Sequence, residues 1–201
     1  MIIRRLAVAS ATLALAGTLA ACGSDDSPAA DTAPAAEAAT PAASDVVLNA
    51  ADVEFAQGMI AHHEQAIEMA EIALDPNIGA SPEVVDLATR IQAAQDPEVE
   101  QMTGWLEAAG EPVTMDMSDG HDMSSMEGMM TADQMDALAA STGTEFDQLW
   151  LEMMIAHHEG AISQSETVKA TGANAEVLAL ADEIIVAQQA EIAEMQALLG
   201  N

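Results

Sequence analysis

The chain has 201 residues, half of them hydrophobic, and 34 Asp or Glu against 4 Lys or Arg give it a formal net charge of −30 at pH 7. This balance excludes nucleic acid and anionic lipid headgroups as binding partners, because both are bound through Lys and Arg. The length suits one domain plus a tether, and the single cysteine rules out an intramolecular disulfide.

Residues 1–21 are predicted to be a lipoprotein signal peptide. A basic start at Arg4 and Arg5 precedes an apolar run, and Leu19-Ala20-Ala21-Cys22 places small residues before a cysteine. The run is shorter than the roughly 20 residues that span a bilayer. We therefore expect an exported protein, anchored by lipid on Cys22 to the extracytoplasmic face of the cell membrane. The alternative is an ordinary signal peptide with an incidental cysteine, and the export route, general secretory or twin-arginine, stays open.

The next segment, 22–51, is predicted to be a disordered tether that carries the lipidated cysteine. It is rich in Ala, Pro, Ser, Thr, Asp and Glu, with almost no large apolar residue before Val46. Such a composition cannot bury enough surface to offset the entropy lost on ordering. The folded part is therefore expected to begin at residue 52.

The folded part contains an internal repeat. Residues 52–71 align without gaps on 147–166, with ten of twenty positions identical, and 83–106 align on 176–199. Apolar residues recur at helical spacing, so each copy is predicted to be a helical hairpin. The first is placed at 52–110, and the second follows a short helix within 131–201. Short turns predict an all-α, antiparallel four-helix bundle.

Punctuating residues predict how these helices begin and end. Ser81 and Pro82 are expected to be the N-cap and first residue of the second helix. Gly172 is expected to stop a later helix in the left-handed conformation. Pro97 should kink or restart the helix that contains it, because proline lacks a backbone donor and clashes with the preceding turn.

Residues 111–130 are predicted to be a polar loop that captures soft metals. Thioethers bind Cu(I) or Ag(I) without losing a proton, and no helical period organises the loop's candidate ligands. The alternative is a linker whose methionines pack on the bundle or absorb oxidants. After the loop, Thr131 and Gln134 predict a capped short helix. The loop's candidates are Met115, Met117, His121, Met123, Met126, Met129 and Met130.

The segment Met-Ile-Ala-His-His-Glu occurs in both copies and carries the main candidate metal ligands, His62, His63, His157 and His158. Adjacent helical residues lie about 100° apart, so both rings of a pair can face the bundle interior. Four imidazoles converging from two helices form a ligand set suited to copper, zinc, iron or nickel. The alternative is a group of hydrogen-bonded core histidines.

Two methionines, Met59 and Met154, precede the histidine pairs on the same helical face. Ligation and core packing are both open for them, and a thioether beside imidazoles favours Cu(I). Met69, which the second copy lacks, is a weaker candidate. Glu64 and Glu159 project onto the polar face and are expected to be solvated.

Polar residues also interrupt the apolar stripe of the two partner helices. A carboxylate or amide directed at a core needs a hydrogen-bonding partner, and orienting the histidines is the use that we expect. The alternative is that these side chains lie at the stripe's edge and reach water. The residues, which are possible extra ligands, are Gln95, Glu98 and Met102 in one helix and Gln188, Glu191 and Met195 in the other.

No catalytic pattern accompanies these residues. The sequence has no His-Glu-x-x-His, no Glu three residues before a His, no Gly-rich phosphate loop and no nucleophile motif. We therefore expect no enzymatic activity. A redox enzyme that cycles copper or iron is the remaining alternative within this class.

The two M-I-A-H-H-E-x-A-I segments, each followed by a helix that reads I-x-x-x-Q-x-x-E, resemble the DUF305 family over residues 52–199. The resemblance implies an exported protein of one or two His-His hairpins in a ferritin-like bundle, associated with copper binding and tolerance. By position, it implies that the motif residues are His62, His63, His157, His158, Met59, Met154, Met102 and Met195. The second copy departs from the motif at Ser163-Gln164-Ser165, so the two copies need not bind metal equally.

The function expected from the sequence is therefore capture of a copper ion, as Cu(I), for sequestration, buffering or transfer to a delivery partner. Affinity at the histidines should fall as pH drops through about 6.5, because protons compete for imidazole. The rival interpretation is a structural or interaction module of the cell envelope. Stoichiometry, oligomeric state and the identity of the metal stay open.

Overall fold

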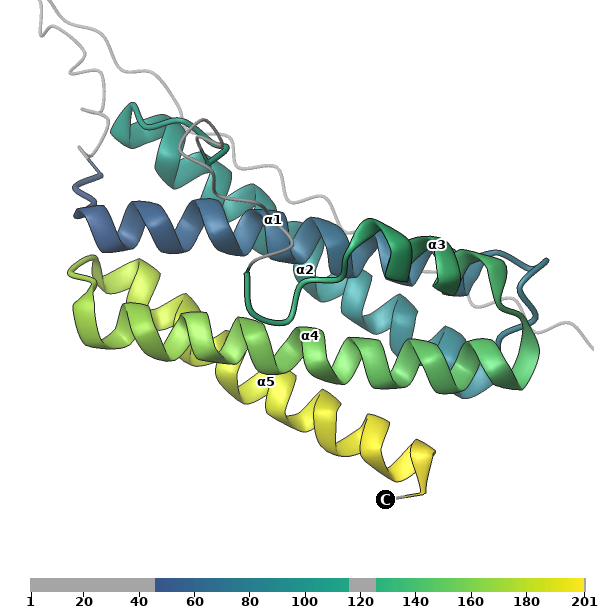
Figure 1. The fold of residues 1–201 in the computed structure, drawn as a ribbon. Helices are drawn as coiled ribbons and strands as arrows, with labels where there is room; N and C mark the ends of the chain where they lie inside the picture. Colours follow the sequence, from purple (N-terminus) through teal and green to yellow (C-terminus); the bar gives the residue numbers. More distant parts are fainter. Residues whose placement is uncertain (1–45, 116–125, 201) are drawn as a thin grey trace, which may run out of the picture. The chain divides into compact units, whose positions relative to one another are not determined.

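The computed structural model describes residues 46–115 and 126–200, and it confirms the predicted all-α class, with no strand in these ranges (Figure 1). The signal peptide, Cys22 and most of the tether lie outside the described residues, as do Met117, His121 and Met123. None of the described helices is long and apolar enough to cross a membrane. The helices are α1 (Ala50–Leu74), α2 (Pro82–Ala109), α3 (Ala132–Ala140), α4 (Gly143–Thr171) and α5 (Ala175–Leu199).

The four long helices form two hairpins that meet through their first helices. α1 packs along α2, α4 packs along α5, and α1 also packs along α4, while the short α3 contacts α4 (Figure 1). The repeated His-His segments lie on α1 and α4. The topology therefore brings the two copies of the motif onto neighbouring helices at the centre of the bundle.

The predicted helix starts are confirmed at Ser81, which caps α2 ahead of Pro82, and at Thr131, which forms a capping box with Gln134 at α3. α1 starts at Ala50, earlier than the predicted residue 52, because Asn49 caps it in a capping box with Asp52. Val46 and Leu48 also pack against the core. The last residues assigned to the tether are thus part of the folded unit.

The expected left-handed end of α4 was wrong. Gly172 follows α4 with φ −72° and ψ 165°, so it is extended and not left-handed. Glycine is needed there for space, because a Cβ would lie 2.6 Å from the Asp52 carboxylate and 2.8 Å from the Val168 carbonyl. Pro97 does not restart its helix, since α2 continues through it from Pro82 to Ala109.

The hydrophobic core consists of two clusters that the repeat relates to each other. One joins the second half of α1 and the first half of α4 with Leu87 and Ile91 of α2. The other joins the first half of α1 and the second half of α4 with the equivalent Leu180 and Ile184 of α5. The bundle therefore has an internal pseudo-twofold relationship, and the motif histidines belong to neither apolar cluster.

A pair of equivalent aspartates ties each copy to the turn of the other. Asp52 is fully buried and accepts hydrogen bonds from the backbone N–H groups of Ala173 (3.0 Å) and Asn174 (3.1 Å) between α4 and α5. Its counterpart Asp147 accepts from the N–H of Ser81 (3.0 Å) between α1 and α2. These contacts satisfy backbone donors that the ends of helices leave free.

Candidate metal centre

All four motif histidines are buried, with at most 1% of each residue exposed. His62 of α1 and His157 of α4 are in direct contact, with ring centroids 4.0 Å apart and ring planes at 57°. His158 lies next to His157, with centroids 6.4 Å apart. The histidines therefore form a polar layer between the two apolar clusters, which we call the histidine layer.

Two of these histidines are held by glutamates from the partner helices. His63 Nε2 lies 2.6 Å from a carboxylate oxygen of Glu98 on α2, and His158 Nε2 lies 2.8 Å from a carboxylate oxygen of Glu191 on α5. The two pairs occupy equivalent positions in the repeat. The structure thus places both glutamates against the histidines, in the orienting position expected from the sequence.

His62 is held differently, by a backbone carbonyl. Residues 126–130, which we call the strap, pass between α1 and α4 (Figure 1), and the carbonyl oxygen of Glu127 lies 3.1 Å from His62 Nε2. Gln65 of α1 fixes the strap by donating to the Met130 carbonyl (2.9 Å) and accepting from its N–H (2.7 Å). The strap therefore closes one side of the histidine layer.

On α4 the strap lies against a glycine. A Cβ at Gly160 would come within 2.0 Å of the Glu127 carbonyl oxygen, so only glycine leaves room for this backbone contact. Gly128 adopts a positive φ of 81°, and a Cβ there would lie 2.6 Å from the Ala156 carbonyl. Gln65 and Gly160 occupy equivalent positions in the two copies of the repeat. Gln65 hydrogen-bonds the strap and Gly160 leaves space for it, so a single strap contacts both helices.

Several nitrogen and oxygen atoms of the motif histidines and of two glutamines on the partner helices are buried and have no hydrogen-bonding partner in the protein. Both ring nitrogens of His157 are among them, as is the Nδ1 atom of each other motif histidine. Leaving a buried polar atom without a partner costs about 1–3 kcal/mol. The unpartnered atoms are His62 Nδ1, His63 Nδ1, His157 Nδ1 and Nε2, His158 Nδ1, Gln95 Oε1 and Gln188 Oε1.

Burial keeps the two central rings neutral. Removal from water lowers the pKa of His62 from 6.5 to about 4, although the Glu127 carbonyl opposes this shift. Burial also holds the pKa of His157 well below 6.5, and the neighbouring histidines lower it further. Neutral imidazole is the form that binds transition metals.

The four imidazoles do not converge on one point as the sequence analysis expects. Within residues 46–115 and 126–200, no group of three or more His, Cys, Asp or Glu side chains is arranged to hold a metal ion. The physical reason is that His63 and His158 turn towards Glu98 and Glu191, and His62 turns towards the strap. His157 is left as the ring that no hydrogen bond holds.

The predicted methionines of the bundle are all buried in the two apolar clusters. Met59 and Met102 lie in one cluster, and Met154, Met195 and Met69 lie in the other. Four of them form equivalent pairs, Met59 with Met154 and Met102 with Met195, whereas Met69 has no counterpart. Thioether sulfur and neutral imidazole are both ligand types that suit copper.

The Met-rich loop divides between two environments. The methyl groups of Met115 and Met126 both lie over Gly58, at 3.0 and 3.4 Å from the position of a Cβ there. Met129 and Met130 are buried, and Met130 packs within the core. Met129 and Met130 therefore fit the alternative in which the loop's methionines pack on the bundle.

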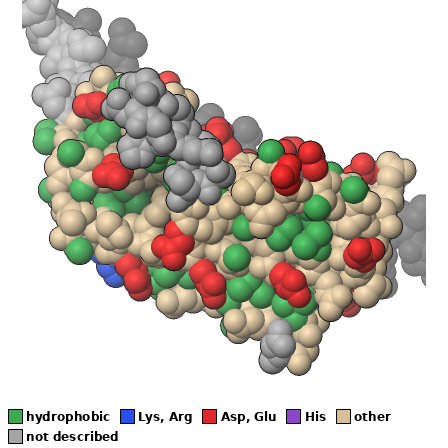
Figure 2. Space-filling view, in the orientation of Figure 1, with side chains coloured by type: hydrophobic (Ala, Val, Ile, Leu, Met, Phe, Trp, Pro, Cys, Tyr) green, Lys and Arg blue, Asp and Glu red, His purple; other side chains and the backbone are tan. Residues whose placement is uncertain are grey.

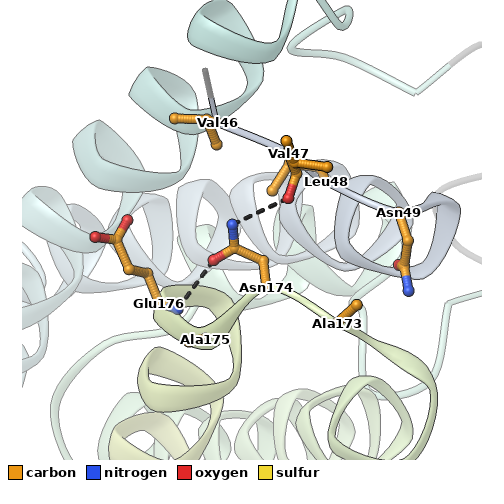
Figure 3. Close-up of a pocket in the computed structure, with 8 residues that line it drawn as sticks. All are labelled: Val46, Val47, Leu48, Asn49, Ala173, Asn174, Ala175 and Glu176. Atoms are coloured by element: carbon orange, nitrogen blue, oxygen red, sulfur yellow. Dashed lines mark hydrogen bonds between the residues drawn. The ribbon is translucent and has the colours of Figure 1, made fainter. Parts of the chain in front are cut away.

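Other polar features lie outside the histidine layer. Glu64 and Glu159 are exposed, as expected, and acidic side chains are spread over the face shown in Figure 2, on which no histidine is visible. A shallow pocket lies elsewhere, between residues 46–49 and 173–176. There the Asn174 side chain donates to the Val47 carbonyl and accepts from the N–H of Glu176 (Figure 3).

Sequence reasoning missed the strap as part of the site. The Glu127 carbonyl is a backbone group, so no side-chain pattern marks it. Two signals were present, however. One is the Gly128 that follows Glu127, and the other is the exchange of Gln65 for Gly160, the first position at which the two copies differ after His-His-Glu. Small residues at such a break indicate close backbone approach.

Fold and site together define a class of protein, the duplicated helical hairpin with histidine pairs buried between its copies. The family model of DUF305, a domain of unknown function, matches residues 52–199. The chain therefore belongs to the DUF305 family. A search of curated proteins finds no match.

Solved structures resemble the chain over most of their length. A DUF305 protein of Streptomyces coelicolor, described as a candidate secreted protein, is 30% identical, with a TM-score of 0.67 and coverage of 75% of this chain and 91% of that one. A DUF305 fragment from Deinococcus radiodurans is 31% identical, with a TM-score of 0.67 and coverage of 76% and 97%. CopM in its Cu(I)-bound form is 31% identical, with a TM-score of 0.60 and coverage of 75% and 96%. CopM is also solved with Cu(II) and with silver.

Proposed function

We propose that this protein binds copper, as Cu(I), outside the cytoplasm and sequesters it, buffers it or hands it to a delivery partner. The histidine layer carries this proposal, because it buries five imidazole nitrogens without partners in the protein. At about 1–3 kcal/mol each, such atoms are costly to a fold that gains nothing from them. A bound ion offsets this cost.

The chemistry of the layer supports a soft or borderline transition metal. His62 and His157 are neutral at neutral pH, since burial lowers the pKa of both. A metal ion can therefore bind these rings without displacing a proton. Imidazole suits copper, and the thioethers of Met59 and Met154 would favour Cu(I) over Cu(II). CopM, which shares the fold, is described in Cu(I)-, Cu(II)- and silver-bound forms.

The two methionines over Gly58 would supply a separate, more accessible soft-metal contact. Met115 and Met126 are partly exposed, unlike the histidines, and Met126 begins the strap that covers His62. Thioethers bind Cu(I) without proton release. Copper capture at this pair should therefore be insensitive to pH, whereas binding at the histidines should weaken in acid.

The amino-terminal sequence and one relative support a proposal on cellular location. We propose export and anchoring through lipid on Cys22, and the Streptomyces coelicolor relative is described as a candidate secreted protein. Copper handling on the extracytoplasmic side needs no catalysis, so we propose a carrier and not an enzyme.

Equilibrium dialysis against buffered Cu(I), without oxygen, tests the proposal on residues 23–201, which include all of the described fold. We expect the wild type to retain copper at pH 7.5 and a variant with His62, His63, His157 and His158 all changed to Ala to retain much less. Glu64→Gln with Glu159→Gln is the matched control, because both residues belong to the same motif but are exposed.

Equal copper retention by the wild type and the four-histidine variant would overturn the histidine assignment. If the Met115→Leu, Met126→Leu variant lost its copper while the four-histidine variant kept it, the methionine pair would be the main site. Retention of no copper by any protein, at normal helical content, would favour a structural module of the cell envelope.

A further inference from the structure

Three of the four buried imidazoles face an oxygen through the same ring atom. His62 Nε2 meets the Glu127 carbonyl at 3.1 Å, His63 Nε2 meets Glu98 at 2.6 Å and His158 Nε2 meets Glu191 at 2.8 Å. A carbonyl oxygen and an ionised carboxylate only accept hydrogen bonds. Each Nε2 atom must therefore carry the hydrogen, and in a neutral ring the lone pair is then on Nδ1.

We propose that His62, His63 and His158 are preset as Nε2–H tautomers that offer Nδ1 as the metal-binding atom, and that His157 is the one adjustable ligand. The tautomer assignment stands on the hydrogen bonds alone. The ligand assignment rests on the proposed function, since it requires that the layer binds a metal.

The unpartnered atoms of the layer match this assignment. The Nδ1 atoms of His62, His63 and His158 are each buried without a partner, while their Nε2 atoms are all engaged. A ligand His usually donates its other ring N–H to a carboxylate or carbonyl, which fixes the tautomer and the ring orientation. The three preset rings have that arrangement before any metal is present.

His157 differs from the other three in having no hydrogen bond at either ring nitrogen. No three candidate ligands among the described residues converge as the side chains stand, so an ion held by three of these groups requires at least one of them to turn. Turning His63 or His158 would break a contact with a carboxylate, whereas turning His157 breaks no hydrogen bond. His157 is therefore the ring that adjusts.

The strap is the part of this arrangement that breaks the pseudo-twofold relationship. Glu127 holds His62 through a carbonyl oxygen, and His157, the equivalent ring to His62 on α4, has no such group. Gly160 makes this possible by leaving space for the Glu127 carbonyl. The strap thus decides which of the two central rings is preset and which adjusts.

Long-range ¹H–¹⁵N NMR of histidine-labelled, metal-free protein at pH 8 tests the tautomers directly, because a protonated and an unprotonated ring nitrogen have well separated shifts. We expect Nε2–H with a bare Nδ1 in His62, His63 and His158, with each residue assigned by its His→Gln variant. Nδ1–H tautomers, or rings protonated on both nitrogens, at these positions would overturn the proposal.

Gly160→Ala tests the role of the strap, since the added methyl displaces the Glu127 carbonyl. We expect His62 alone to lose its fixed tautomer, while His63 and His158 keep theirs. Gly104→Ala is the matched control, because Gly104 is also helical but a Cβ there meets nothing within 4 Å. If Gly160→Ala does not fold, Glu98→Ala tests the same principle at His63. An unchanged ring in the folded variant would contradict the proposal.

Silver(I) then tests the ligand assignment, as a redox-inert substitute for Cu(I). We expect the Nδ1 shifts of the preset rings that bind the ion to move while their Nε2–H protons remain, and the His157 signals to move as well. Loss of the Nε2–H protons on adding silver would overturn the ligand assignment but not the proposed function. No silver-induced shift in any ring would contradict the proposed function and the ligand assignment together, and the tautomers of the metal-free protein would stand.

Discussion

His62 and His157 occupy the same place in the two copies of the repeat, yet their rings lie 4.0 Å apart in one buried layer. Two protonated rings at this distance would repel each other strongly in a medium of low dielectric. Burial lowers the pKa of both rings and keeps them neutral. The contact at the centre of the bundle therefore depends on both histidines staying unprotonated.

The stability of the metal-free protein should fall in mild acid for this reason. The pKa of His62 is about 4 in the folded chain and about 6.5 when unfolded, so the unfolded chain binds more protons between these values. The contribution is fully present above pH 6.5 and is lost as pH falls towards 4. We expect His62 alone to lower the free energy of unfolding by roughly 3 kcal/mol over this window, with His157 adding to it.

Urea denaturation at several pH values between 7.5 and 4.5 measures this effect. The double variant His62→Gln, His157→Gln should show a shallower dependence on pH than the wild type, because it lacks both of the perturbed rings. Parallel curves for the two proteins would contradict the assignment of the acid sensitivity to the central pair.

The paired glutamates should contribute equally to stability. Glu98→Ala and Glu191→Ala each leave a buried imidazole N–H without its acceptor, so each should lower the free energy of unfolding by about 1–3 kcal/mol. Glu64→Ala, an exposed site in the motif, should change it by less than about 0.5 kcal/mol. Chemical denaturation of the three variants checks this, and a loss for Glu64 as large as for Glu98 would count against it.

The two bridging aspartates should contribute unequally. Asp52 is fully buried and accepts from the backbone of Asn49, Ala173 and Asn174, whereas Asp147 is partly exposed and accepts from Ser81. We expect Asp52→Ala to destabilise the fold by about 2 kcal/mol or more, since several donors lose one acceptor, and Asp147→Ala by less. Thermal unfolding of both variants ranks them, and the reverse order would contradict the account.

Two helical glycines should respond in opposite directions to alanine. Gly104→Ala should stabilise the protein by roughly 0.5–1 kcal/mol, because alanine is the better helix former and the site is open. Gly160→Ala should destabilise it by about 1–3 kcal/mol, because its methyl overlaps the Glu127 carbonyl. Stabilisation by both substitutions would show that the strap does not hold to α4.

Much of this architecture is readable from the sequence, because helical hairpins leave a local signature. The repeat, the apolar spacing and the caps at Ser81 and Thr131 are short-range features, and they predict the helices and their pairing. The burial of His62 and His157 also follows, since their neighbours on the same face are apolar.

What the sequence could not predict depends on contacts between distant segments. Gly172 looks like a left-handed stop, but it is needed because Asp52, more than a hundred residues away, fills the space of its side chain. The sequence predicts that Met129 and Met130 are ligands in a loop. In the structure both are buried, because the strap is hydrogen-bonded to Gln65 and lies against Gly160. Local propensity carries no information on such tertiary contacts.

X-ray absorption spectroscopy at the copper edge would show whether the buried histidines hold copper. Residues 23–201 would be loaded with one equivalent of Cu(I), beside the variant with all four motif histidines changed to Ala and the Glu64→Gln, Glu159→Gln control. We expect the multiple-scattering signature of imidazole in the wild type and the control, and its loss in the histidine variant. Identical spectra for the wild type and the histidine variant would contradict it.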